Sequence, residues 1–214
     1  MREQEYFQTA VIPCKDCGRD PAIAGFLTFT KLEPFVGAGD KRVLLLGHSP
    51  KVRTSSKITT TLDLMEHRQV RRYVVTEVLT PLGIDLQSCY ATNAVKCLTT
   101  RMPEDIDGEL RFMESAFSHC MRHLLEELAL TKPKLVISFS ERISTLLQSQ
   151  FAVHRTIRPM KELFGTLQSL EVHGNTIPWI PAVHVPKAKV RRHYFPEQTS
   201  RLTALSQEVG GLLS

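Results

Sequence analysis

Apolar residues along this chain form short continuous runs, separated by longer stretches in which they recur at helical spacing. The run Lys41–Gly47 ends at a glycine and predicts a buried strand of a parallel sheet. From Thr60 to Leu82 the apolar spacing predicts a helix, which Pro81 and Gly83 bring to an end. By the same criteria we expect strands over Ser88–Cys97, Pro133–Ser140, Gly165–Val172 and Thr176–His184, and helices over Leu110–Leu130, Glu141–Gln150 and Glu197–Leu213.

Strands that alternate with helices of this length predict an α/β fold with a parallel sheet covered on both faces. The last two strands are joined at His173-Gly174-Asn175, which is a hairpin signal. We expect a single domain over residues 1–214, whose first 35 residues are irregular. Ligands of such sheets bind at the carboxyl ends of the strands. The segments that carry function are therefore expected at residues 47–50, 93–97, 138–142 and 184–194.

The composition is that of an ordinary globular protein. Hydrophobic residues make up 42% and charged residues 23%, which excludes collagen-like, disordered and coiled-coil proteins. No apolar run reaches the roughly 18 residues that a membrane span needs, and the first ten residues lack the apolar core of a signal peptide. We therefore expect a cytoplasmic protein without a membrane partner. The net charge of +5 is compatible with a polyanionic partner.

Five cysteines in a reducing compartment do not make a disulfide framework, and an odd number cannot pair fully. Cys14 and Cys17 form a C-x-x-C, Cys97 and Cys120 stand alone downstream, and Cys89 falls in a predicted strand. A redox C-x-x-C of the thioredoxin kind begins a helix, whereas prolines and a glycine surround this one. A zinc ribbon has a second C-x-x-C, which is missing here. A zinc site and an iron–sulfur cluster both remain open, because spacing alone does not separate them.

The segments at the strand ends resemble a known family in their order along the chain. They are LLLGHSP, YATNAVKC, KLVISFS and IPAVHVP, and together they resemble the uracil-DNA glycosylase superfamily, in particular its iron–sulfur branch. The resemblance covers roughly Val11 to Arg192, and its most specific part is T-N-A-V-K-C at Thr92–Cys97. It implies a three-layer α/β/α sandwich around a small, mainly parallel, four-stranded sheet.

The resemblance also implies roles for individual residues. Asn93 would read the edge of the flipped base, since its amide offers one acceptor and two donors. His184 would donate to the base as negative charge builds on it. The family's four ligands of a 4Fe–4S cluster, for which zinc is the alternative, are matched in type and order by Cys14, Cys17, Cys97 and Cys120.

The base pocket departs from the family pattern. His48 stands where the family has Glu, and Ser49 where other branches carry Asp, Asn or Ala. Serine is not a strong base, so water activation by an aspartate at this position is excluded, and His48 serves as a second donor or orients the water. Thr54 falls where an aromatic residue normally stacks on the base. We predict that His184, His48 and Ser49 are catalytic and that Asn93, Gly47, Pro50 and Thr54 bind the base.

A basic run follows His184, where the family has a loop that pushes into the DNA. Its charges would hold phosphates, and Val190 or Tyr194 would wedge between bases. The residues predicted to contact DNA are Lys187, Lys189, Arg191, Arg192 and Tyr194. DNA is therefore the expected partner of a monomeric, nucleoid-associated protein.

These departures predict a roomier and more polar pocket than one shaped for uracil. Our hypothesis is a DNA glycosylase that flips out a modified or damaged pyrimidine and excises it, leaving an abasic site. A hypermodified cytosine of phage DNA, such as glucosylated 5-hydroxymethylcytosine, fits this pocket and implies an antiphage role. Two alternatives stay open: a uracil-DNA glycosylase of base-excision repair, and a protein that binds DNA or modified bases without cutting them.

Overall fold

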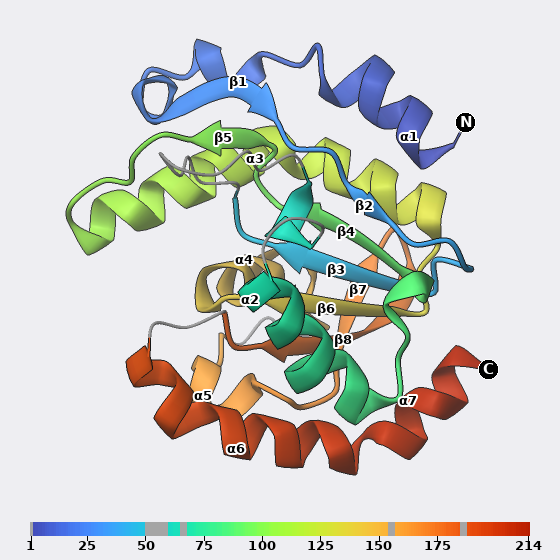
Figure 1. The fold of residues 1–214 in the computed structure, drawn as a ribbon. Helices are drawn as coiled ribbons and strands as arrows, with labels where there is room; N and C mark the ends of the chain where they lie inside the picture. Colours follow the sequence, from blue (N-terminus) through green and yellow to red (C-terminus); the bar gives the residue numbers. More distant parts are fainter. Residues whose placement is uncertain (1, 50–59, 65–67, 154–156, 185–187) are drawn as a thin grey trace.

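The computed structural model describes residues 2–49, 60–64, 68–153, 157–184 and 188–214. Its centre is a six-stranded sheet in the order β2-β4-β3-β6-β8-β7 (Figure 1). The inner four strands are parallel, and β2 and β7 pair antiparallel at the two edges. The strands of this sheet are β2 (Phe35–Val36), β3 (Val43–Gly47), β4 (Cys89–Asn93), β6 (Leu135–Phe139), β7 (Gln168–Val172) and β8 (Asn175–Ala182).

The expected α/β sheet is confirmed, but the expected number of four strands is wrong. The two additional strands are β2 and β7. They hydrogen-bond to backbone groups of β4 and β8 that would otherwise be unpaired at the edges of the parallel sheet. β7 does so through the predicted hairpin, in which His173 and Gly174 adopt φ of 50° and 78°, as a tight two-residue turn requires. β2 is only two residues long, and no hydrophobic pattern marks so short a strand.

The helical segments vary in length and type. The α-helices are α1 (Glu3–Tyr6), α2 (Arg68–Arg72), α3 (Ile106–Thr131), α4 (Glu141–Phe151), α5 (Met160–Leu163), α6 (Ala188–Ala204) and α7 (Ser206–Leu213). The π-helical segments are η1 (Phe7–Val11) and η5 (Tyr73–Leu79). The 3-10 turns are η2 (Asp16–Arg19), η3 (Ala24–Phe26), η4 (Thr61–Asp63), η6 (Thr80–Leu82) and η7 (Leu86–Ser88).

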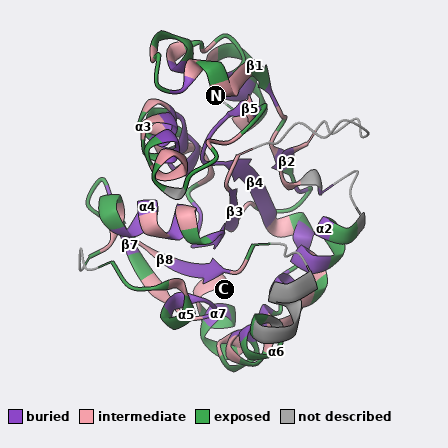
Figure 2. Ribbon diagram, turned by 90° about the vertical axis from the view of Figure 1, so that its left-hand side faces the viewer, coloured by how far each residue is buried: buried purple, intermediate pink, exposed green. Residues whose placement is uncertain are grey.

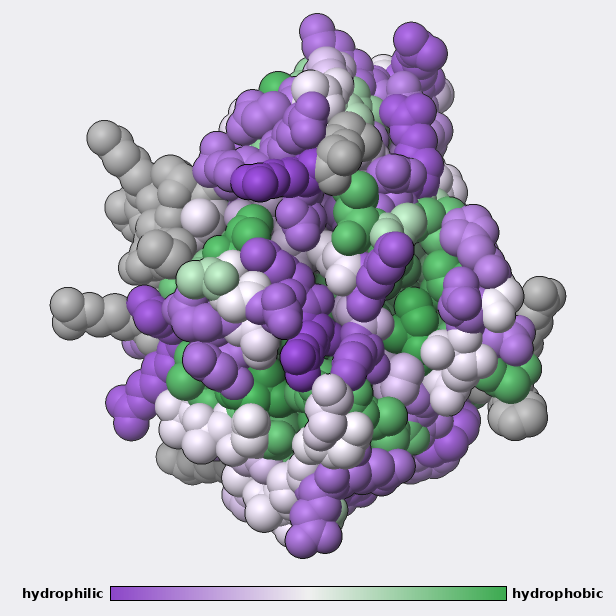
Figure 3. All heavy atoms as spheres, turned by 90° about the vertical axis from the view of Figure 1, so that its right-hand side faces the viewer, coloured by the Kyte–Doolittle hydropathy of each residue, from purple (hydrophilic) through white to green (hydrophobic). Residues whose placement is uncertain are grey.

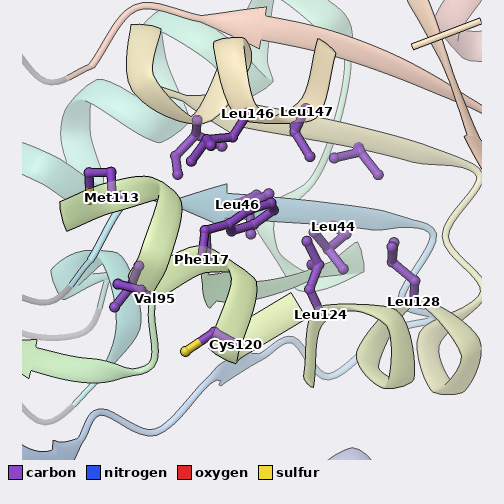
Figure 4. Close-up of a cluster of buried hydrophobic side chains, with 14 of the residues drawn as sticks. Leu44, Leu46, Val95, Met113, Phe117, Cys120, Leu124, Leu128, Leu146 and Leu147 are labelled. Carbon is purple, nitrogen blue, oxygen red and sulfur yellow. The ribbon is translucent and has the colours of Figure 1, made fainter. Parts of the chain in front are cut away.

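Helices cover both faces of the sheet and give the structure three layers. Along β3, Leu44 and Leu46 point into a core that they share with α3 and α4 (Figure 4). Val43 and Leu45 point to the opposite face, into a core formed with η5, α6 and α7. This division follows from the two-residue period of a strand, which sends successive side chains to opposite faces.

The predicted strand Ser88–Cys97 is in fact two strands in different sheets. β4 ends at Asn93, where the chain leaves the large sheet. The next strand, β5 (Cys97–Thr99), pairs antiparallel with β1 (Leu27–Lys31) in a separate two-stranded sheet. The first 35 residues are therefore not wholly irregular, because they contribute β1 together with α1 and three short helical turns.

Two predicted helices differ from the structure. The segment from Thr60 to Leu82 is divided into η4, α2, η5 and η6 instead of one helix. The predicted helix Glu197–Leu213 is two helices, α6 and α7, and α6 begins at Ala188, nine residues earlier than predicted. Among the described residues, none of the helices combines the length and the apolar character that crossing a bilayer requires.

The two ends of the sheet differ in the surface that they present. Figure 2 looks onto the carboxyl ends of the parallel strands, where β3, β4 and β8 are buried between the helical layers. Figure 3 shows the opposite side of the molecule, where hydrophilic side chains predominate and apolar ones lie between them. Such a mixed surface is ordinary for a folded protein. The candidate site lies at the end of the sheet that faces the viewer in Figure 2.

Candidate active site at the carboxyl edge of the sheet

Gly47 and Asn93 end neighbouring strands and lie opposite each other in the ladder between β3 and β4. Asn93 is buried, and its side chain covers the Cα atom of Gly47. A Cβ atom at position 47 would lie 2.3 Å from Asn93 Oδ1 and 2.5 Å from Leu62 Cδ2. Glycine is therefore needed at position 47 for Asn93 to occupy this place.

Two backbone hydrogen bonds tie the loop after β4 to the loop after β3. The N–H of Ala94 donates to the carbonyl of Gly47 at 2.9 Å, and the N–H of Val95 donates to the carbonyl of His48 at 3.0 Å. They hold the segment after Asn93 against the end of β3 and the residue that follows it. They also make His48 and Asn93 parts of one rigid unit.

His48 and Ser49 form a side-chain pair directly after β3. The Nδ1 atom of His48 lies 2.8 Å from Ser49 Oγ, and both residues are half-buried. A hydroxyl group can donate or accept, so Ser49 holds the imidazole ring in either tautomer. The pair thus places an oriented proton donor or acceptor where the sequence predicted catalytic residues.

His184 lies at the same edge of the sheet. β8 ends at Ala182, which pairs with Phe139 at the end of β6, and β6 is the neighbour of β3. His184 follows Ala182 by two residues and is exposed. The structure therefore gathers His48, Asn93 and His184 at one edge, from β3, β4 and β8, as the sequence predicted.

Two residues at this edge have strained backbone conformations. Leu62, which contacts the Gly47–Asn93 pair, has φ 58° and ψ 15°. Ser140 follows β6 with φ 136° and ψ 152°, and its Oγ accepts from the N–H of Ile143 at 3.3 Å to cap α4. Such conformations cost about 1–3 kcal/mol each and cluster at functional sites. The sequence contained no signal for them, because neither residue is a glycine.

A buried ion pair lies behind Asn93. Lys96 Nζ donates to Glu127 Oε2 at 2.5 Å and to Thr92 Oγ1 at 2.6 Å, and Lys96 and Glu127 are only 6% and 2% exposed. The other oxygen of Glu127 accepts from Tyr90 at 3.0 Å and from Thr92 at 2.9 Å. Burial and the Glu127 charge raise the pKa of Tyr90, which stays a donor. No sequence pattern predicts this network; the one signal for it is that Glu127 lies close to Leu124 and Leu128 in the predicted helix Leu110–Leu130.

Three of the four predicted cluster ligands meet in the core between α3 and the N-terminal segment. The single S–H of Cys17 is shared between the sulfur atoms of Cys120 and Cys97. These bonds raise the pKa of Cys17 and lower those of Cys97 and Cys120, that of Cys120 to about 7. The backbone N–H of Lys96 also donates to Cys120 Sγ, at 3.4 Å. Lys96 thus belongs to the buried ion pair through its side chain and contacts Cys120 through its backbone.

Cys14, the fourth predicted ligand, is contacted by two cations. Arg122 Nη2 donates to Cys14 Sγ at 3.3 Å, and Lys31 Nζ donates to the Cys14 carbonyl at 2.5 Å. Lys31 is the partner of Cys97 in the β1–β5 ladder. In the part of the chain that the structure describes, no group of three or more His, Cys, Asp or Glu side chains converges as the ligands of one metal ion. Cys89 lies apart, and burial raises its pKa to about 12.

Of the predicted DNA-binding residues, some lie in α6 and one lies outside the described residues. Lys189, Arg191 and Arg192 belong to α6, so the prediction that they lie in a loop is wrong, and their side chains are outside the described residues. Tyr194 is 40% exposed and packs edge-on against Phe164, with ring centroids 5.6 Å apart. Three further predicted residues also lie outside the described part, namely Pro50, Thr54 and Lys187.

An α/β sandwich that gathers an amide and two imidazole groups at the carboxyl edge of its sheet has the architecture of an enzyme that binds its ligand there. The model of the Uracil DNA glycosylase superfamily matches residues 34–194, and the chain belongs to this superfamily. Its members are DNA glycosylases, which hydrolyse the bond between a base and its sugar. The match begins after Cys14 and Cys17, so the iron–sulfur branch stays a prediction. No curated protein matches the chain.

Replacing Gly47 by alanine should impair base excision more than it impairs folding. The new Cβ atom overlaps Asn93 Oδ1, so Asn93 must move, and we expect excision to slow about 10–100-fold. Overpacking should cost about 1–3 kcal/mol of unfolding free energy. Gly25→Ala is the matched control, because nothing lies within 4 Å of a Cβ atom there. Single-turnover excision and thermal melting measure both effects, and equal rates for the two variants would contradict the placement of Asn93.

Proposed function

We propose that this protein excises a modified or damaged pyrimidine from DNA by hydrolysing its N-glycosidic bond. The observation that carries the proposal is the convergence of Asn93, His48 and His184 at one edge of the sheet in a member of the superfamily. A glycosylase must hold its base outside the duplex, since the glycosidic bond cannot be reached within the stack. The amide of Asn93 suits the hydrogen-bonding edge of such a base.

The proposed chemistry assigns one role to each of these residues. Water oxygen bonds to the sugar C1′ atom, the C1′–N bond breaks, and its electron pair leaves with the base. His184 donates to the base as this negative charge develops, which lowers the barrier. His48, oriented by Ser49, positions the water and takes its proton, and the base gains a proton from solvent.

We further propose that the base is hypermodified, with glucosylated 5-hydroxymethylcytosine of phage DNA as the leading candidate. The His48–Ser49 pair replaces the carboxylate of the family pattern with groups that both donate and accept. In the sequence, Thr54 falls where the family pattern has an aromatic ring, and a threonine is smaller than such a ring, as a substituted base would require. The hydroxyl groups of a sugar substituent require such space and such partners. Antiphage defence follows from this specificity.

Two other functions are compatible with particular observations. Plain uracil also offers Asn93 a matching hydrogen-bonding edge, which favours a repair enzyme. The lack of a carboxylate at positions 48 and 49 favours a protein that binds DNA or a modified base without cutting it. In each case DNA affinity falls with salt, so binding alone does not separate the three functions.

The test is a panel of duplexes of one sequence that carry a single uracil, 5-hydroxymethylcytosine or glucosylated 5-hydroxymethylcytosine. Abasic sites are scored as breaks after alkali treatment, with Asn93→Ala as the inactive control. We expect breaks in the glucosylated duplex. Faster cleavage of the uracil duplex would replace the modified-base proposal with uracil repair. Binding without any break would favour the non-catalytic function.

We propose that Cys14, Cys17, Cys97 and Cys120 hold a 4Fe–4S cluster. Thiol ligands alone, with N–H donors directed at Cys120 and Cys14 sulfur, suit such a cluster, because hydrogen bonds to sulfur tune and stabilise it. The cluster would tie the N-terminal segment to β5 and α3. Zinc is the alternative occupant of the same residues.

Loss of one ligand should remove the cluster and destabilise the fold. We expect anaerobically purified protein to be brown with about four iron atoms per chain. Cys97→Ala should be colourless and melt about 10 °C or more below the wild type, since metal binding is coupled to folding. Cys89→Ala changes a buried cysteine outside the set and should keep its iron. One zinc per chain without colour would support the alternative, and a brown Cys97→Ala would contradict the ligand set.

A further inference from the structure

Val183, the residue before His184, is held at both of its backbone groups. Its N–H donates to Gln198 Oε1 at 2.7 Å, and its carbonyl accepts from the hydroxyl of Tyr73. Nε2 of Gln198 donates to the Tyr73 hydroxyl at 3.1 Å, which closes a ring of three hydrogen bonds. Oε1 of Gln198 faces a donor and Nε2 faces an acceptor, so the orientation of the Gln198 amide is determined.

This ring is buried where three elements meet. Gln198 on α6 is fully buried and Tyr73 on η5 is 3% exposed. The Tyr73 ring also packs edge-on against Phe139, the last residue of β6, with ring centroids 6.4 Å apart. Burial raises the pKa of Tyr73, which keeps its hydroxyl protonated. Buried hydrogen-bond networks that are fully satisfied are rigid and specify one geometry.

The ring fixes the chain at the point where the sheet no longer does. β8 pairs with β6 as far as Ala182, and the described residues that follow make no strand pairing. The carbonyl of Val183 belongs to the planar peptide unit that ends at the Cα atom of His184. A hydrogen bond to this carbonyl and one from the N–H of the same residue therefore fix the position of the His184 Cα atom relative to α6 and η5.

We propose that Gln198 and Tyr73 are positioning residues that aim His184 at the leaving base. The proposal rests on the function proposed above, in which His184 donates to that base. Misplacing a catalytic group by about 1 Å can slow a reaction about 100-fold, so a clamp on its backbone has catalytic value. Gln198 lies on the same helix as the predicted phosphate-binding residues Lys189, Arg191 and Arg192.

Gln148 provides a matched control for Gln198. It is a glutamine, 3% exposed, whose amide also hydrogen-bonds to the backbone of a single residue, here at both of its backbone groups. It accepts from the N–H of Arg158 at 2.7 Å and donates to the Arg158 carbonyl at 3.3 Å. α4 begins at the carboxyl end of β6, and Gln148 lies near its far end, away from His184. Gln148→Met and Gln198→Met thus remove equivalent clamps in different places.

The experiment compares single-turnover excision by the wild type, Gln198→Met, Gln148→Met and Tyr73→Phe. We expect Gln198→Met to slow excision about 10–100-fold with little change in DNA affinity, because only the placement of His184 is disturbed. Tyr73→Phe should slow excision in the same way but less, since the Gln198–Val183 bond remains. Gln148→Met should lose comparable melting temperature and keep the wild-type rate. Equal slowing by the two glutamine variants, or none by Gln198→Met, would overturn the proposal.

A second readout does not depend on activity. The ring C–H signals of His184, assigned with His184→Ala, are followed by nuclear magnetic resonance in both glutamine variants. We expect them to move in Gln198→Met and to stay in place in Gln148→Met. If the wild type excises no base, the proposed function fails, while these signals still decide whether the clamp positions His184. Unmoved signals in Gln198→Met overturn the clamp.

Discussion

His184→Ala is expected to excise its base about 10²–10³-fold more slowly than the wild type, because it lacks the donor that meets the charge on the leaving base. DNA affinity should change little, since phosphate contacts supply most of it. Single-turnover kinetics at saturating enzyme separate the two quantities. The fold should also persist, because His184 is exposed and lies beyond the last residue of β8.

His173→Ala is the control for this variant. His173 is also exposed and also lies next to β8, but in the hairpin turn at the opposite end of that strand. We expect wild-type excision from it. If His184→Ala also kept the wild-type rate, His48 would have to be the donor to the base.

Glu127→Gln is expected to lower the free energy of unfolding by about 3–5 kcal/mol, because it leaves the ammonium group of Lys96 buried without its counter-charge. For a chain of this length this corresponds to a fall of about 10 °C in melting temperature. Excision should fall as well, since Thr92 and Lys96 flank the loop that carries Asn93. Denaturant unfolding and thermal melting measure the loss of stability.

Glu197→Gln makes the same change in an exposed ion pair. Glu197 and Arg201 lie one turn apart on α6, and Arg201 Nη2 is 2.5 Å from Glu197 Oε1. The Glu197 side chain is 53% exposed. Exposed pairs of this kind contribute about 0.3–0.5 kcal/mol. The double variant Lys96→Met/Glu127→Leu should recover part of the loss, because neither charge is then left unpaired. If Glu127→Gln and Glu197→Gln had the same free energy of unfolding, the charge of Glu127 would not be what compensates the buried charge of Lys96.

The placement of the site was largely predictable from local sequence. The apolar run that ends at Gly47, and the hairpin signal before His184, indicated strands of a parallel sheet, and parallel strands carry their carboxyl ends to one edge. Asn93, His48 and His184 follow such strands and therefore meet. The superfamily was likewise predictable, because its motifs occur in order within the matched residues 34–194.

The supporting contacts were not predictable, because they join segments that are distant in sequence. Glu127 lies 31 residues from Lys96, and Gln198 lies 125 residues from Tyr73, so no local pattern relates them. The left-handed backbone of Leu62, whose side chain lies against Gly47, does not follow from its residue type. The division of the predicted strand at Asn93 coincides with backbone bonds to another loop, which spacing and propensity do not report.

If the carboxyl edge of this sheet releases a base from DNA, the free base can be detected directly. We would use mass spectrometry of the small molecules released when phage DNA containing glucosylated 5-hydroxymethylcytosine is incubated with the wild type and with Asn93→Ala. We expect free glucosylated 5-hydroxymethylcytosine from the wild type and none from the variant. No free base from the wild type, with the DNA intact after alkali, would contradict this expectation.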